Sequence, residues 1–334
     1  MIKMRIVVFC SLTIFLTSGN VFGSCGAATC PLNNHHYLKS GSLLLGLTHE
    51  YINQDQIYTG TSLSYVGAIQ NGHHDEVQTL NERNLFQLQY GVSDHLALNM
   101  TLPFIHREHS HISHENGGNT WESWNFSGLG DMTVSAQYSL LVPSGEFKPY
   151  FDLVAGAKLS TGVTNEINNE GEEAEVTIQP GTGSRDVFVG LNYRQTLFSA
   201  PTFSGNYSAV PLIVGVTYQM NGKGIRDYRF GNFLQTHLET AYQFVDRASF
   251  LLQINGKFQD FADVGLIDEP RENTGGTWIY LSPGIGLQLS DELSGHVYFQ
   301  TPVYQNVHGI QQTAKFNLLF GLSYQFDVLG SVPD

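Results

Sequence analysis

A repeated alternation of apolar and polar residues is clearest in the segment 86–104, which reads FQLQYGVSDHLALNMTLPF. Every second residue is apolar over 86–92 and again over 96–104, and Gln, Asn, Thr or small residues mostly fill the positions between. A period of two is typical of a β-strand with one apolar face. The short polar link at Ser93 and Asp94 predicts a tight turn, so the segment is expected to form an antiparallel hairpin.

The same alternation recurs along the chain, with no convincing helical period. Counting the hairpin, it marks twelve segments: 43–47, 86–92, 96–104, 132–140, 151–159, 187–193, 210–218, 234–244, 250–258, 279–287, 297–299 and 316–324. A soluble sandwich would cover its outer face with Lys and Glu, whereas a transmembrane barrel turns an apolar face to lipid, where Lys or Arg costs about 2–4 kcal/mol. Every charge within these segments lies on the polar face. The pattern predicts an all-β fold, a transmembrane antiparallel up-and-down β-barrel of twelve strands, with 10–14 as the range.

Loop lengths and aromatic residues agree with a barrel. Short turns follow the second, eighth and tenth segments, and long polar stretches follow the first, third and fifth, at 53–80, 105–127 and 161–183. Outer-membrane barrels have short periplasmic turns and long external loops. Tyr and Phe gather near the turn end of the even-numbered segments, as an interfacial girdle requires.

The composition excludes several classes of protein. The chain has 334 residues, of which 14% are charged, with a formal net charge of −14. An acidic chain without a basic cluster is not expected to bind nucleic acid. The hydrophobic fraction of 41% is too low for a bundle of membrane helices, and the many aromatic residues argue against disorder.

The N-terminus has the pattern of an export signal. Lys3 and Arg5 flank the start of an apolar run at 6–16, and Val21 and Gly23 occupy the −3 and −1 positions of a signal-peptidase site. The run is shorter than the ~20 residues that a membrane helix needs. We predict a cleaved signal peptide at 1–23, an N-terminal extension at 24–40, the barrel at 41–326 and a C-terminal tail at 327–334.

Two cysteines, Cys25 and Cys30, remain after cleavage. An even number of cysteines in an exported chain favours a disulfide between them. Metal binding by the two thiolates is the weaker alternative, because no second cysteine pair completes a tetrahedral site. A lipid anchor on Cys25 is a further alternative, although residues 22–24 form a poor lipobox.

Several glycine-rich phrases resemble a known family. They are Gly128-Leu129-Gly130-Asp131, Lys158-Leu159-Ser160-Thr161-Gly162, residues 181–186, Thr274-Gly275-Gly276, Ser282-Pro283-Gly284 and residues 301–309. In this order they resemble the outer-membrane transporter-like β-barrel family labelled as phenol meta-cleavage pathway proteins, over roughly 41–326. The resemblance implies passage of small, aromatic or hydrophobic compounds across the outer membrane. By themselves, the glycines also suit the bulges and corners of a curved barrel.

Ionisable residues on the polar faces are the candidates for the lumen: Glu50, Asp152, Lys158, Arg194, His237, Glu239, Lys257, His296 and Lys315. Opposed acids and bases could set up a transverse field that orients solutes, or could neutralise one another in a packed lumen. His237 and Glu239 share a face, but no nucleophile motif accompanies them, so an enzyme is not predicted.

Loop histidines are the candidate metal ligands: His106, His109, His111 and His114, with His73, His74 and Asp75 in the preceding outer loop. Imidazole suits Zn and Cu, but a loop must bend to bring the first four rings together, which predicts weak binding. Solvated histidines are the alternative. The stretch 166–175 is acidic, and either is simply solvated or attracts divalent cations that bridge it to lipopolysaccharide. No other cofactor is predicted.

These features together predict an exported protein of the bacterial outer membrane. The expected function is a channel for passive passage of small solutes, with outer-membrane lipid, lipopolysaccharide and the solute as partners. The alternative is a closed structural or ligand-binding barrel without transport. Twelve strands lie between the filled eight-stranded barrels and the open porins of 16–18 strands, so strand number does not decide between the two.

Overall fold

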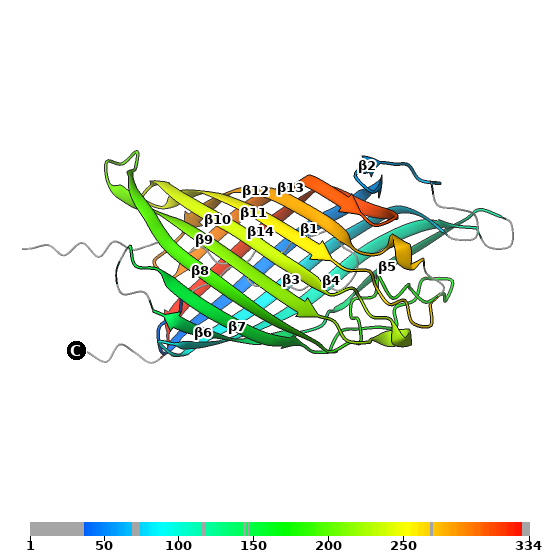
Figure 1. Ribbon diagram of the computed structural model, residues 1–334, viewed down its shortest axis with the longest axis horizontal. Helices are drawn as coiled ribbons and strands as arrows, with labels where there is room; N and C mark the ends of the chain where they lie inside the picture. Colours follow the sequence, from blue (N-terminus) through cyan, green and yellow to red (C-terminus); the bar gives the residue numbers. More distant parts are fainter. Residues whose placement is uncertain are drawn as a thin grey trace, which may run out of the picture.

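The computed structural model describes residues 37–68, 74–114, 118–142, 145, 147–267 and 270–328. Twelve antiparallel strands form its closed wall (Figure 1), and each pairs with the next in the chain. They are β1 (Ser42–Thr59), β3 (Asp75–Ser93), β4 (Leu96–Ser113), β6 (Thr133–Leu141), β7 (Tyr150–Lys158), β8 (Asp186–Pro201), β9 (Tyr207–Met220), β10 (Phe233–Val245), β11 (Ala248–Gln259), β12 (Gly276–Gln288), β13 (Leu293–Val307) and β14 (Ile310–Asp327). Pairing of β14 with β1, from Ser42↔Asp327 to Thr59↔Ile310, closes the barrel. The predicted fold is confirmed, and each of the twelve predicted segments lies within one residue of the bounds of a wall strand.

Two short strands complete the sheet. β5 (Thr120–Leu129) pairs with the distal half of β4, and β6 pairs with its proximal half, so the two together form one interrupted strand. β2 (Ser62–Leu63) forms a small hairpin with the end of β1. Single 3-10 turns lie at Ile225–Asp227 and Arg271–Asn273. Among the described residues, no helix has the length and hydrophobicity to cross a membrane. The predicted signal peptide and Cys25–Cys30 pair lie outside the described residues and stay predictions.

Side chains alternate between an exposed apolar outer face and a buried inner face. On β11, the outward-facing residues Phe250, Leu252 and Ile254 are 49%, 41% and 41% exposed. Gln253 and Asn255, which alternate with them and face inward, are 0% and 1% exposed. An apolar row that points away from the barrel is stable only against lipid, because the backbone of a closed sheet is already fully paired. The lipid therefore imposes the period of two that the sequence displays.

The predicted outer loops 53–80 and 105–127 are mostly strand, which corrects that expectation. β1 continues to Thr59, β3 begins at Asp75, and β4 and β5 extend as a hairpin up to Ser113 and from Thr120. Beyond the lipid both faces of a strand meet water or protein, so the apolar alternation ends although the backbone ladder continues. The tight turns after β3, β10 and β12 are confirmed.

Three long connections pack together at the loop end of the barrel, on the right in Figure 1. They are the β7–β8 loop (159–185), the β9–β10 loop (221–232) and the β11–β12 loop (260–275). Val176, Tyr228 and Ala262, one from each loop, form a buried apolar cluster. Ala174 and Ile178 of the β7–β8 loop also pack on Trp124 and Phe126 of β5. The loops thus form a single layer over the outer mouth.

Candidate functional site

The inner wall of the barrel carries a continuous belt of amide and hydroxyl side chains across β10 to β14. Gln253 donates to Glu239 (3.0 Å) and to the hydroxyl of Tyr298 (3.2 Å). The belt continues through three more hydrogen bonds: Ser282 to Asn255 at 3.1 Å, Gln300 to Ser282 at 3.3 Å, and Asn317 to Gln300 at 2.8 Å. Each of these strands therefore contributes a polar group at about the middle of the wall.

Charged groups on the inner wall are paired. Glu50 of β1 forms a buried ion pair with Arg83, its register partner on β3. Asp152 of β7 is fully buried and accepts hydrogen bonds from Gln137 (3.0 Å) and Ser139 (2.6 Å) of β6. Buried charges without such partners would be strongly destabilising, so these contacts are what allow ionisable residues inside the wall.

An aromatic strip lies beside the amide belt. The ammonium of Lys257 is 5.3 Å from the ring centre of Phe233 and 5.7 Å from that of Trp278, distances typical of cation–π contacts. Tyr280 packs with Trp278, and Tyr298 packs with Leu251 and Leu319. The inner wall therefore offers flat apolar rings next to hydrogen-bonding groups.

Several inner polar atoms have no protein partner. Both amide atoms of Asn192, Oδ1 of Asn317 and Nε2 of His296 are buried without a hydrogen bond to any described residue. Buried polar atoms are almost always satisfied by protein or by ordered water. These atoms have almost no surface that water can reach, so ordered water can satisfy them only if neighbouring side chains shift.

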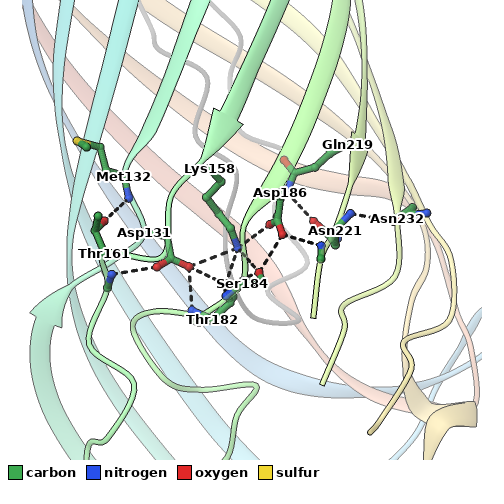
Figure 2. Close-up of polar contacts among 12 residues, drawn as sticks. Asp131, Met132, Lys158, Thr161, Thr182, Ser184, Asp186, Gln219, Asn221 and Asn232 are labelled. Carbon is green, nitrogen blue, oxygen red and sulfur yellow. Dashed lines mark hydrogen bonds and ion pairs between the residues drawn. The ribbon is translucent and has the colours of Figure 1, made fainter. Parts of the chain in front are cut away.

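Lys158, at the end of β7, is the centre of a polar cluster at the loop end of the lumen (Figure 2), which we call the Lys158 node. Its ammonium lies 2.6 Å from Asp186 and 3.3 Å from Asp131, and donates to Thr182 (2.5 Å) and Ser184 (3.1 Å). All five side chains of the node are buried. One cation thus holds together the break between β5 and β6, the start of β8 and the returning end of the β7–β8 loop.

The two carboxylates of the node also anchor loop backbone. Asp131 accepts hydrogen bonds from the amides of Gly162 (2.9 Å) and Thr182 (2.8 Å). Asp186 accepts one from the amide of Gly222 (2.9 Å), at the start of the β9–β10 loop. The node therefore fixes where two of the three mouth loops leave the wall.

Glycines allow the backbone to pass through the node. A Cβ on Gly181 would lie 2.6–2.8 Å from the backbone of Gly162, and a Cβ on Gly162 would meet Gly181, Gly130 and Asp131 at 2.6–2.9 Å. Three of the glycine-rich phrases thus meet at one place, and the structure assigns their glycines an architectural role.

Eight of the nine lumen candidates lie on the inner row, and Lys315 does not. Arg194 stacks on Tyr150 with 5.8 Å between the guanidinium carbon and the ring centre, and His296 packs edge-on against Tyr298 at 5.4 Å. His237 is buried on β10. Lys315 is exposed, because the β1–β14 register shifts between Asn317 and Ala314 and the bulge turns its side chain outward. The strict alternation assumed for this strand was wrong at that point.

Arg107 is a key inner residue that the sequence did not identify. It is fully buried on β4 and donates to the side chain of Asn81 and to the carbonyl oxygens of Ile178 and Gln179 in the β7–β8 loop. It was missed because it lies in the stretch that was expected to be a loop. The only sign of it in the sequence is that it is two residues from Ile105 and from His109, and so lies on the same inward face of the strand.

The four predicted metal ligands divide into two pairs. His109 and His111 point inward, with 3.4 Å between Nε2 and Nδ1, while His106 bonds Ser127 on the outer side. His114 bonds Asp75 at 2.7 Å. The four rings do not converge, because a strand alternates its side chains and residues 106–113 are strand.

Glu175 of the β7–β8 loop lies against the inner pair. Its carboxylate is 3.2 Å from Nδ1 of His111 and 3.3 Å from Nε2 of His74. Burial alone would raise the pKa of Glu175, but the hydrogen bond from His111 and the charges of His74, His109 and His111 outweigh it and lower the pKa to about 2. The carboxylate is therefore ionised at neutral pH.

Comparisons with known proteins give a structural match. No family model matches the chain, and no curated protein is similar to it at a significant level. An outer-membrane channel from Pseudomonas putida F1 superposes with a TM-score of 0.60 at 14% identity, covering 88% of this chain and 100% of that one. The transport unit of the autotransporter AIDA-I from Escherichia coli gives 0.48 at 11% identity over 88% and 93%, and the toluene transporter TodX from P. putida gives 0.41 at 9% over 93% and 99%. The first of these shows that the chain shares the fold of an outer-membrane β-barrel.

Proposed function

We propose that the protein is an outer-membrane channel for passive passage of small solutes, exported by its N-terminal signal. The observation that carries the proposal is the inner wall, whose polar atoms on Asn192, His296 and Asn317 lack protein partners although they are buried. A barrel stabilised as a solid plug would satisfy such atoms with protein, since each unmade hydrogen bond costs about 1–3 kcal/mol. A path that becomes hydrated when inner side chains shift would give them water as a partner.

The inner wall also supports a preference for small aromatic or hydrophobic solutes. Trp278, Tyr280 and Tyr298 line one side of the inner wall next to the amide belt and are at most 2% exposed, so a solute reaches their rings only when neighbouring side chains shift. Aromatic rings attract flat apolar solutes by stacking, while neighbouring amides bind their polar substituents. The sequence resemblance to a transporter-like family points the same way, while the outer-membrane channel from P. putida that shares the fold supports a channel role without indicating its solute.

A closed barrel without transport is the second candidate, and one observation favours it. Inner side chains such as Gln253, Ser282 and Gln300 are at most 1% exposed, so the lumen is narrow at the amide belt. A solute must displace ordered water and shift side chains there. The loops over the mouth add a further barrier.

Liposome swelling with the refolded protein separates the two candidates. Benzenesulfonate and methanesulfonate carry the same permanent charge, so neither crosses lipid readily and they differ mainly in the ring. We expect the protein to permit entry of both, with faster entry of benzenesulfonate than its larger size alone would allow. Vesicles that remain impermeable to both ions, with the barrel shown to be folded by heat-modifiable migration, would favour the closed barrel. If the rates of entry follow the sizes of the two ions alone, the aromatic preference is wrong but the channel stands.

A further inference from the structure

Five residues at the outer mouth bring their donor atoms together in two groups of three that share Glu175, and we call them together the mouth cluster: His74, Glu76, His109, His111 and Glu175. They come from three parts of the chain: the start of β3, the distal part of β4, and the β7–β8 loop. His109 and His111 are 2% and 4% exposed. We propose that this cluster binds one divalent transition-metal ion, with Zn²⁺ as the best match.

The distances between neighbouring donor atoms are close to those between ligands of one tetrahedral ion, with Glu76 offering Oε1 to His74 and Oε2 to His109. The separations are 3.3 Å for His74–Glu175, 3.2 Å for His111–Glu175, 3.2 Å for His74–Glu76, 3.4 Å for His109–His111 and 3.5 Å for His109–Glu76. Bonds of about 2.0–2.1 Å to Zn²⁺ require tetrahedral edges of about 3.3–3.4 Å. The five separations of 3.2–3.5 Å lie close to that edge length.

Hydrogen bonds behind two of the rings turn their lone pairs into the cluster. The hydroxyl of Thr79 donates to Gln312 (2.5 Å), so it accepts from Nδ1 of His109 (2.9 Å) and leaves Nε2 of that ring as an acceptor. Nε2 of His111 lies 2.9 Å from the carboxylate of Glu122, which can only accept, so in the neutral ring Nδ1 is the acceptor. A carboxylate or hydroxyl behind the ring is the usual arrangement at metal-bound histidines.

With neutral rings the cluster lacks a positive charge, which a divalent cation would supply. Nε2 of His109, Nδ1 of His111 and the carboxylate of Glu175 are all acceptors facing one another when the rings are neutral. Glu76 adds a second carboxylate, and its buried Oε2 has no hydrogen-bond partner among the described residues. Two carboxylates and neutral imidazoles carry a charge that one divalent ion balances, and imidazole with carboxylate is a ligand set that suits Zn²⁺.

Binding would join the β7–β8 loop to the barrel wall, because Glu175 belongs to the loop and the three histidines belong to β3 and β4 or their immediate ends. The site does not depend on solute passage and stands whether or not the barrel conducts. Its predicted effect is mechanical: the ion holds the loop layer against the β3–β4 side of the mouth.

Calorimetric titration of ZnCl₂ into the full-length chain, refolded in detergent and stripped with a chelator, tests the proposal. We expect one ion per chain for the natural sequence and at least a tenfold loss of affinity in the double variant His109→Ala/His111→Ala. The matched control is His106→Ala/His114→Ala, which removes two neighbouring histidines outside the cluster and should bind as the natural sequence does. Co²⁺ substitution should give the intense visible absorption of tetrahedral coordination in the natural chain and the control only.

The outcomes decide the matter in either direction. Absence of saturable binding by the natural sequence, or equal loss in both double variants, would overturn the site. If the inner double variant does not refold, Glu175→Gln replaces it, since this loop substitution keeps the size of the side chain and removes its charge. Undiminished affinity in folded Glu175→Gln, together with no zinc-dependent protection of the loop from protease, would also overturn it.

Discussion

At the level of single residues, the inner wall depends on charges that have several partners at once. Lys158 contacts Asp131 and Asp186, and these carboxylates in turn accept hydrogen bonds from backbone amides of two loops. Lys158 therefore does more than pair with one acid. It neutralises two carboxylates whose loop contacts require them to be ionised.

Replacing Lys158 with Met should leave two like charges buried side by side. Removal of one partner from a buried ionic group costs about 3–5 kcal/mol, because the remaining charge is desolvated and unpaired. We expect the free energy of unfolding of Lys158→Met to fall by that amount in denaturant titrations followed by tryptophan fluorescence. Lys315→Met is the control, since Lys315 is exposed and surface changes usually stay within about 0.5 kcal/mol. Similar stability of the two variants would contradict the role of the node.

Alternation along β7 was enough to place Lys158 inside the barrel, but its partners could not be predicted. Asp131 and Asp186 lie in glycine-rich phrases that meet only once the wall has closed and the β7–β8 loop has folded back. Lys315 shows the opposite failure, because a bulge in β14 turns its side chain outward against the alternation of the strand. Alternation in the sequence therefore predicts the face on which a side chain lies only as far as the next bulge.

At the level of elements, the strands were predictable where lipid covers them and not beyond. Outside the lipid, β4 and β5 continue as a hairpin in which residues 106–111 of β4 are polar on both faces, so His106 to His114 resembled a loop in the sequence. The mouth cluster could not be derived for the same reason. Its partners, His74 and Glu175, lie far apart in the sequence and meet through the folding of the β7–β8 loop.

Arg107 of β4 holds the β7–β8 loop in the mouth of the barrel. Its guanidinium donates to the carbonyl oxygens of Ile178 and Gln179, and a hydrogen bond from a charged donor contributes about 1.5–3 kcal/mol. In Arg107→Gln the loop should therefore leave the wall more than ten times as often as in the natural chain. The mean single-channel conductance should rise as a result. His106→Gln, one position along on the outer side, should leave the conductance unchanged. An unchanged conductance in Arg107→Gln would show that the loop does not limit passage.

At the level of the whole molecule, the barrel combines an apolar outer surface with an inner wall of amides, paired charges and aromatic rings. An apolar outer surface of this kind requires lipid or detergent around it, and the inner wall of mostly uncharged polar groups agrees with the low share of charged residues in the sequence. Both follow from the same alternation, read on opposite faces of each strand. The central claim is that the inner face lines a continuous, water-filled path through the membrane.

Cysteine modification during planar-bilayer recording tests that claim most directly. In a background of Cys25→Ser and Cys30→Ser, Ser282→Cys places a thiol in the amide belt, and Ile285→Cys places one on the lipid face of the same strand. A positively charged, water-soluble methanethiosulfonate should reduce the current through Ser282→Cys and leave Ile285→Cys unaffected. Absence of any current from the folded natural chain, or a current through Ser282→Cys that the reagent does not change, would contradict the account.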